Sequence, residues 1–354
     1  MKKTICLLLG LALLLCACAA PQSGTEATTH QGRRFTDSLG RSVPLPHTID
    51  SIAITGPLSQ VYILPLAGDL LVGVSQRYGG DAEKYLPREI LEKTEIGQLY
   101  GGKGEMDLEG LLSVMPDLVI DIGEPKESME EDLDGLWDQT GIPFIHIDAT
   151  VRTAPEAYRT LGKLLGREEQ AEELARWLEE TYAAITAMVE RVDADGARKT
   201  VLYCLGDKGT NVIARGSFHG ETIQMLADNQ AVLEDVAAKG TGNEVDLEQL
   251  LLWDPEYILF APDSCFHAVG GDPQWQQLSA VKAGKVYLTP AAPYGWLSSP
   301  PAVQRYLGML WLGALLYPEY AEYDLQEEVT EYYELFYHCD LTDEMYAELT
   351  DNAL

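Results

Sequence analysis

Side chains that could bind a ligand recur directly after short apolar runs of the chain. Aromatic rings offer flat apolar walls to a macrocycle or a chelate, and an arginine can pair with carboxylates. In open parallel sheets, ligands bind beyond the carboxyl ends of the strands. If the apolar runs are such strands, the candidate contact residues are Arg77, Tyr78, Tyr100, Glu124, Arg215, Phe218, His219, Trp296 and Arg305.

Three of the chemically interesting side chains also have ordinary structural explanations. Trp296 could pack in a core, and Arg305, at the start of a predicted helix, could form a salt bridge. His146 lies inside an apolar run and is expected to be a core residue, which leaves His219 as the only histidine nominated near a ligand. For Trp296 and Arg305 both explanations stay open.

Motifs of catalysis and of metal binding are missing from the sequence. It contains no GxSxG or GxGxxG motif, and no HxxxH or His/Asp cluster. Cys204, Cys265 and Cys339 are far apart in the sequence and are expected to be buried thiols. We therefore expect no enzymatic activity, no cofactor and no metal held by protein side chains alone.

The charge and the N-terminus indicate where the protein works. The chain has 25 Lys and Arg against 56 Asp and Glu, a formal net charge of −31, which repels polyphosphate and excludes nucleic-acid binding. Its first residues, MKKTICLLLGLALLLCACAA, have the anatomy of a secretory signal and an apolar run too short to span a bilayer. Leu15-Cys16-Ala17-Cys18 resembles a lipobox, so we expect cleavage before Cys18 and lipid attachment to its sulfur. Cys16 is the weaker choice because bulky Leu15 would precede it, and an ordinary cleaved signal is the alternative.

An internal repeat organises the rest of the chain. Residues 105–120 read EMDLEGLLSVMPDLVI and residues 244–259 read EVDLEQLLLWDPEYIL, with seven of sixteen positions identical. Each copy predicts a short helix after an aspartate, a stop at a proline and a buried strand. Glu109 and Glu248 occupy the same position in the two copies, where helix-dipole stabilisation alone would also favour an acidic residue.

Apolar runs that alternate with helical stretches predict an α/β fold of two Rossmann-like lobes with parallel sheets. The runs are 52–56, 71–75, 117–123, 143–148, 200–206, 257–262 and 285–290. Residues 153–192 show an amphipathic helical pattern, interrupted near Gly166, that predicts a long connecting helix. The expected organisation is a signal peptide (1–17), a flexible tether (18–34), an N-terminal lobe (35–152), the connecting helix (153–192), a C-terminal lobe (193–316) and a helical tail (317–354).

The sequence resembles the bacterial metal-chelate substrate-binding proteins of ABC importers, the class with a helical backbone that carries iron-siderophores, haem and cobalamin. The resemblance rests on the lipobox at Cys18 and on MDLEGLLSVMPDLVI, GIPFIHID, LGKLLGREEQAEELA and WQQLSAVKAGKVY, in that order. It implies two lobes joined by one long helix, with a ligand cleft between them. It also implies a lipid-anchored, monomeric, extracytoplasmic receptor, on the periplasmic or outer-surface side, that delivers its ligand to a permease dimer with its ATPase.

The resemblance also implies roles for particular residues. Glu109 and Glu248 match glutamates that dock such proteins to permease arginines, and Tyr294 and Trp296 resemble the aromatic position that lines the cleft. The expected ligand is an iron chelate, such as a siderophore or haem. Cobalamin and an oxyanion such as molybdate are the alternative ligands on the same fold.

Two other functional classes fit the same architecture. A ligand sensor for a membrane kinase would use the same cleft. An enzyme or electron-transfer protein of nitrogenase-like fold would need cysteine ligands for a cluster, and the mature chain offers only its three scattered cysteines.

Overall fold

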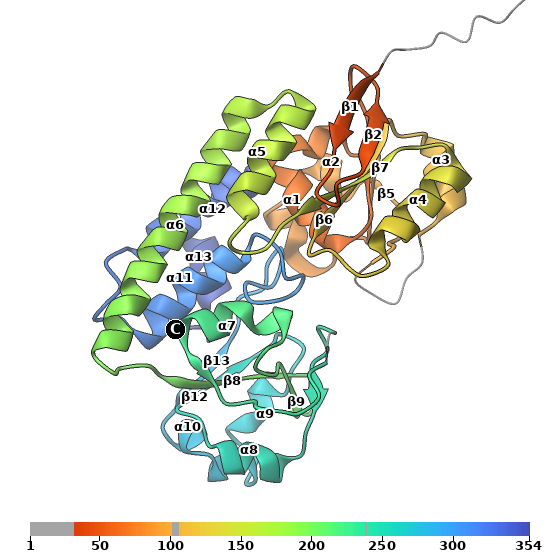
Figure 1. Cartoon of the computed structure of the whole chain (residues 1–354). Coiled ribbons are helices and arrows are strands. Elements are labelled where there is room, and N and C mark those ends of the chain that lie inside the picture. Colours follow the sequence, from red (N-terminus) through yellow and green to blue (C-terminus); the bar gives the residue numbers. More distant parts are fainter. Residues whose placement is uncertain (1–31, 101–105, 238) are drawn as a thin grey trace, which may run out of the picture. The chain divides into compact units, whose positions relative to one another are not determined.

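The structure, a computed structural model, describes residues 32–100, 106–237 and 239–354 (Figure 1). The predicted signal peptide, Cys18 and most of the predicted tether lie outside the described residues. β1 (Arg33–Thr36) pairs antiparallel with β2 (Ser42–Leu45). Residues 33 and 34, assigned to the tether from their polar composition, are therefore part of a strand, because the pairing with β2 supplies backbone partners that composition does not reveal.

The N-terminal lobe contains a parallel sheet in the order β3-β6-β7, and every residue of β6 is buried. Such complete burial is typical of a parallel strand covered on both faces. A further parallel pair, β4 with β5, lies in the same lobe. The strands are β3 (Ile52–Ile54), β4 (Gly73–Val74), β5 (Thr94–Glu95), β6 (Leu118–Gly123) and β7 (Phe144–Asp148). The helices of this lobe are α1 (Pro57–Ala67), α2 (Arg88–Leu91), α3 (Leu108–Val114) and α4 (Met129–Thr140).

The sheet of the C-terminal lobe is mixed. Strands β8, β10, β12 and β13 are parallel, whereas β9 runs antiparallel to β8 and β11 runs antiparallel to β9. The predicted parallel sheet is therefore extended by antiparallel pairing at one edge. The strands are β8 (Thr200–Leu205), β9 (Asn211–Val212), β10 (Asp228–Asn229), β11 (Asn243–Glu244), β12 (Tyr257–Phe260) and β13 (Val286–Leu288), and the helices are α7 (Glu221–Leu226), α8 (Leu247–Trp253), α9 (Phe266–Val269) and α10 (Ser279–Lys282).

Two helices occupy the predicted connector. α5 (Ala154–Leu165) and the 27-residue α6 (Glu168–Ala194) pack against each other and are separated at Gly166, whose φ of 70° is left-handed. Glycine ends a helix this way because it has no Cβ to clash in that conformation. The chain continues through α11 (Arg305–Leu316), α12 (Leu325–Tyr337) and α13 (Asp343–Thr350). Helix α12 packs on both α1 and α11, so the C-terminal segment contacts elements from both ends of the chain.

Short 3₁₀ turns complete the described elements: η1 (Gly68–Leu70), η2 (Gly80–Lys84), η3 (Phe218–Gly220) and η4 (Trp275–Gln277). Among the described helices, none has the length and hydropathy that a membrane span requires. Cys204 is buried as expected, but Cys265 and Cys339 are only partly buried, and all three are free thiols.

The sequence repeat is also a structural repeat. The side chain of Asp107 accepts a hydrogen bond from Gly110 N (2.9 Å), and that of Asp246 accepts one from Gln249 N (2.8 Å), so an aspartate caps each helix. Helices α3 and α8 both have seven residues and both end at a left-handed residue, Met115 (φ 45°) or Asp254 (φ 36°). Each is followed by a central strand of its sheet, β6 or β12.

Candidate functional site

Three polar side chains join the N-terminal lobe to the loop after β13. The hydroxyl groups of Tyr78 and Tyr294 lie 2.7 Å apart, and the amide nitrogen of Gln60, on α1, donates to both, at 2.6 and 3.2 Å. The amide oxygen of Gln60 accepts from the backbone N–H of Ser75 (2.8 Å), which fixes its orientation. We call Gln60, Tyr78 and Tyr294 the tyrosine bridge. Burial raises the pKa of Tyr78 to about 12, so the bridge is made of neutral phenols.

Arg77 stands beside the tyrosine bridge in the sequence, in the segment after β4. Its side chain is 78% exposed, and its Nε lies 3.9 Å from a carboxylate oxygen of Glu95, too far for a hydrogen bond. The guanidinium group therefore keeps its donors available to solvent or to a ligand. This is the placement expected of a contact residue after a strand end.

A second group of side chains surrounds Arg305 at the start of α11. Its Nη1 donates to Oε2 of Glu221 (2.7 Å) and lies 3.4 Å from the carbonyl oxygen of Phe218, and its guanidinium carbon lies 4.5 Å from the centre of the Phe218 ring. The side chain of Arg305 is only 1% exposed, whereas that of Glu221 is 37% exposed. We call Phe218, Glu221 and Arg305 the Arg305 cluster. In this cluster the guanidinium of Arg305 is buried, and the carboxylate of Glu221 lies between it and solvent.

Carboxylates at the strand ends of the N-terminal lobe lie near the Arg305 cluster. Glu124 directly follows β6 and Asp148 ends β7. Although Glu124 is exposed, partial desolvation raises its pKa, the negative charge of Glu221 raises it further, and Arg305 opposes the shift. Charged groups of the two lobes therefore interact electrostatically at the Arg305 cluster, and polar groups of the two lobes are hydrogen-bonded at the tyrosine bridge.

The raised pKa of Glu124 predicts a pH-dependent change in stability for Glu124→Gln. A carboxyl group whose pKa is higher in the folded than in the unfolded state destabilises the fold once it ionises, and this cost disappears below both pKa values. The variant should therefore melt at a higher temperature than the wild type at pH 7, and the difference should shrink as the pH falls toward 4. Thermal unfolding at several pH values measures this. Glu127→Gln, at an exposed position, is the control, and a difference independent of pH would contradict the prediction.

Other nominated residues serve local structure. The hydroxyl of Tyr100 donates to Asp132 (3.0 Å), and the ammonium of Lys126 lies 3.7 Å from the centre of the Tyr100 ring. Nδ1 of His219 lies 3.4 Å from the carbonyl oxygen of Ser298, and burial lowers the pKa of His219, which favours its neutral form. His219 thus connects η3 with the loop that carries Tyr294.

Arg215 lies away from the carboxyl ends of the parallel strands. Because β9 is antiparallel to β8, the chain after β9 returns toward the amino end of β8. Arg215 is exposed, and its Nε donates to the carbonyl oxygen of Asn229, which pairs with Val201 near the start of β8. The expectation that Arg215 lies in a strand-end loop at the ligand edge is wrong, because the unpredicted strand β9 turns the chain back along β8.

Burial favours the structural explanation for both Trp296 and Arg305. Trp296 has 0% exposure and packs in the main core, so it offers no surface to a ligand in this conformation. Arg305, also fully buried, forms the salt bridge that was its structural alternative. His146 is a core residue as expected, with its Nδ1 2.7 Å from Asp121.

Two residues of these groups were missed from the sequence. Glu221 ends the segment ARGSFHGE, which held three nominated residues, so its position was a usable signal. Gln60 lies within the apolar helix α1, where nothing in the local pattern distinguishes it from a surface residue. Only the tertiary structure places it beside the two tyrosines.

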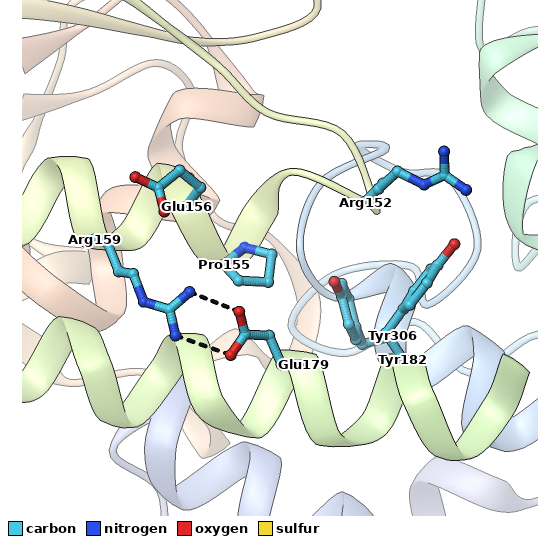
Figure 2. Close-up of a pocket in the computed structure, with 7 residues that line it drawn as sticks. All are labelled: Arg152, Pro155, Glu156, Arg159, Glu179, Tyr182 and Tyr306. Carbon is cyan, nitrogen blue, oxygen red and sulfur yellow. Dashed lines mark hydrogen bonds and ion pairs between the residues drawn. The ribbon is translucent and has the colours of Figure 1, made fainter. Parts of the chain in front are cut away.

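A separate pocket of about 210 Å³ is lined by residues from the start of α5, from α6 and from α11 (Figure 2). It contains none of the nominated residues. Figure 2 shows the guanidinium of Arg159 paired with Glu179 along one side, and Arg159 also pairs with Glu172. Within the described ranges, no group of three or more His, Cys, Asp or Glu side chains is placed to hold a metal ion.

Comparison with known proteins gives consistent matches over most of the chain. A family model described as "Periplasmic binding protein" matches residues 57–293. The chain is 24% identical over 351 residues to the molybdate-binding protein MolA of Haemophilus influenzae, covering 92% of this chain and 95% of that one. It is 25% identical over 291 residues to the Fe(3+)-citrate-binding protein YfmC of Bacillus subtilis, covering 78% and 87%. An ABC transporter solute binding protein from Sulfurospirillum deleyianum superposes with a TM-score of 0.81 at 26% identity, covering 90% of this chain and 99% of that one.

Proposed function

Because this chain belongs to the periplasmic binding protein family, we propose that it captures an anionic iron chelate outside the cytoplasm and delivers it to an ABC importer. The homologues are solute-binding proteins and not enzymes, in agreement with the missing catalytic motifs. The function of such a protein is capture and release, so it depends on differences in affinity between states and breaks no bond.

The observation that carries the proposed ligand is the exposed guanidinium of Arg77, which directly precedes Tyr78 of the tyrosine bridge in the sequence. Side chains from both lobes meet at this bridge, which is the place where a bilobal protein can hold a ligand between its lobes. A guanidinium forms charge-assisted hydrogen bonds to carboxylates, and phenol rings add apolar walls. A ferric chelate with carboxylate groups has both kinds of surface.

An oxyanion such as molybdate is the second candidate ligand. The specific observation in its favour is that the molybdate-binding relative matches nearly the whole chain. A small tetrahedral oxyanion would use Arg77 and the hydroxyl groups but would gain little from aromatic walls.

Titration calorimetry of the purified protein with ferric citrate, haem, cobalamin and molybdate distinguishes these candidates. We expect saturable binding of ferric citrate. Arg77→Ala should weaken it about tenfold, since a charge-assisted hydrogen bond contributes about 1.5–3 kcal/mol. Arg88→Ala, an exposed arginine on α2, is the matched control. Binding of molybdate alone would favour the second candidate, and no binding of any probe would contradict both.

Partner recognition is the other part of the proposal. Glu109 and Glu248 are exposed at the second position of α3 and α8, and they are related by the structural repeat. Two equivalent carboxylates suit a permease dimer that offers two similar cationic sites. We also propose that Cys18, which lies outside the described residues, carries the lipid that holds the protein at the membrane.

A further inference from the structure

Exposed large apolar side chains gather on the two repeated helices. Among the described residues, Leu112 (39% exposed) and Met115 (65%) lie at α3, and Leu252 (79%) lies on α8. An exposed apolar side chain by itself needs no explanation, but several beside paired carboxylates at repeated positions are typical of a protein contact surface.

On α8, Leu252 follows Glu248 by four residues and so lies on the same face of the helix. Leu250 faces the core instead, with no exposed surface. At the position of Leu252 in the repeat, α3 has Ser113, whose hydroxyl donates to the carbonyl oxygen of Gly110 (2.7 Å). The N-terminal lobe therefore has no apolar side chain at the repeat position of Leu252.

The end of each helix shows the opposite difference. Met115 and Asp254 occupy the same position of the repeat, and both have a left-handed backbone conformation. Asp254 accepts hydrogen bonds from the backbone N–H and the hydroxyl of Ser279, both at 2.7 Å, so it serves the lobe internally. Met115 is largely exposed, and Leu112 lies three residues after Glu109 on the neighbouring face. The N-terminal lobe thus presents its apolar surface at the C-terminal end of its helix.

We propose that Leu252 in one lobe and Met115 with Leu112 in the other are apolar anchors for the permease, beside the carboxylates Glu248 and Glu109. This inference rests on the proposed function. The two glutamates suit a cationic partner with two similar sites. Leu112 and Leu252 follow their glutamates by three and four residues, whereas Met115 follows Glu109 by six, just beyond the end of α3. Since the anchors occupy different repeat positions, the two lobes make unequal apolar contacts with the two halves of the permease.

The test is the dissociation constant between the purified full-length protein, without ligand, and the permease–ATPase complex in lipid nanodiscs. Leu252→Ser and Met115→Ser should each weaken binding about tenfold, because a buried aliphatic side chain contributes about that factor or more. Val232→Ser, at another exposed apolar residue, is the matched control and should change the constant less than twofold. The melting temperature of each variant checks that the exposed substitutions leave the fold intact.

A combined variant tests the inequality of the lobes. Ser113→Leu on the Leu252→Ser background moves the leucine to the equivalent position of the other lobe, and it should not restore affinity. Restored affinity would overturn the inequality. A different result is that both single variants bind within twofold of the wild type while charge reversal at Glu109 and Glu248 still abolishes binding. That result would show that the apolar side chains are not anchors, and it would leave the proposed docking through the glutamates intact. If the charge reversal also has no effect, the proposed docking itself fails.

Discussion

Cells that carry Glu109→Lys together with Glu248→Lys are expected to lose uptake of the ligand almost completely, while the purified variant binds the ligand as the wild type does. The two side chains are exposed and are not part of a hydrophobic core. Reversing their charge should therefore leave the fold intact. If the two glutamates face cationic sites of the permease, as we propose, two lysines turn two attractions into repulsions, and like charges at an interface cost several kcal/mol. Uptake of labelled ligand and calorimetry on the same variant measure the two halves of this expectation.

The matched control reverses two carboxylates elsewhere. Glu173 on α6 and Glu319 after α11 are both exposed, and Glu173→Lys with Glu319→Lys changes the net charge by the same amount. This control should transport normally, which separates a local docking effect from a change in the charge of the whole surface. Loss of ligand affinity in the Glu109 and Glu248 variant would place these residues in the ligand site and contradict the docking role.

Glu221→Gln is expected to lower the free energy of unfolding by about 3 kcal/mol, because it leaves the guanidinium of Arg305 buried without its counter-charge. Glu124 also interacts electrostatically with Arg305, but among the described residues it forms no salt bridge with it. For a chain of this size the loss corresponds to a melting temperature lower by about 5 °C. Differential scanning calorimetry at pH 7 measures it.

A double variant separates the charge effect from packing. Arg305→Met with Glu221→Leu removes both partners and should destabilise less than Glu221→Gln, because no buried charge remains unpaired. A wild-type melting temperature for Glu221→Gln would show that Arg305 finds another partner. The Arg305 cluster would then not be a fixed part of the fold.

The α/β fold could be predicted from the sequence because its strands are continuous apolar runs. Each of the seven runs contains a strand of the structure, and the repeat gave the position of α3 and α8. Strands β9 and β11 were missed, since two paired residues such as Asn211 and Val212 leave no periodic pattern. Their antiparallel direction then moved Arg215 away from the expected ligand edge.

Site residues were predicted less well, for a physical reason. A loop sequence shows which side chains are present after a strand, but not which of them turn inward. Trp296 and Arg305 were nominated for their chemistry, yet the structure buries both, whereas Arg77 stays exposed. Gln60 entered the site only because α1 and the loop after β13 meet in space.

The sequence by itself determined the class of fold, the repeated acidic helices and the absence of catalytic motifs, because these depend on local periodicity and on residue type. The tertiary structure decided which groups from distant segments meet. Tyr78 and Tyr294 are more than two hundred positions apart, and Glu221 and Arg305 more than eighty, so no local pattern connects them. Contacts between the lobes depend on how the two sheets pack around α5, α6 and α11, and that packing is a property of the whole chain.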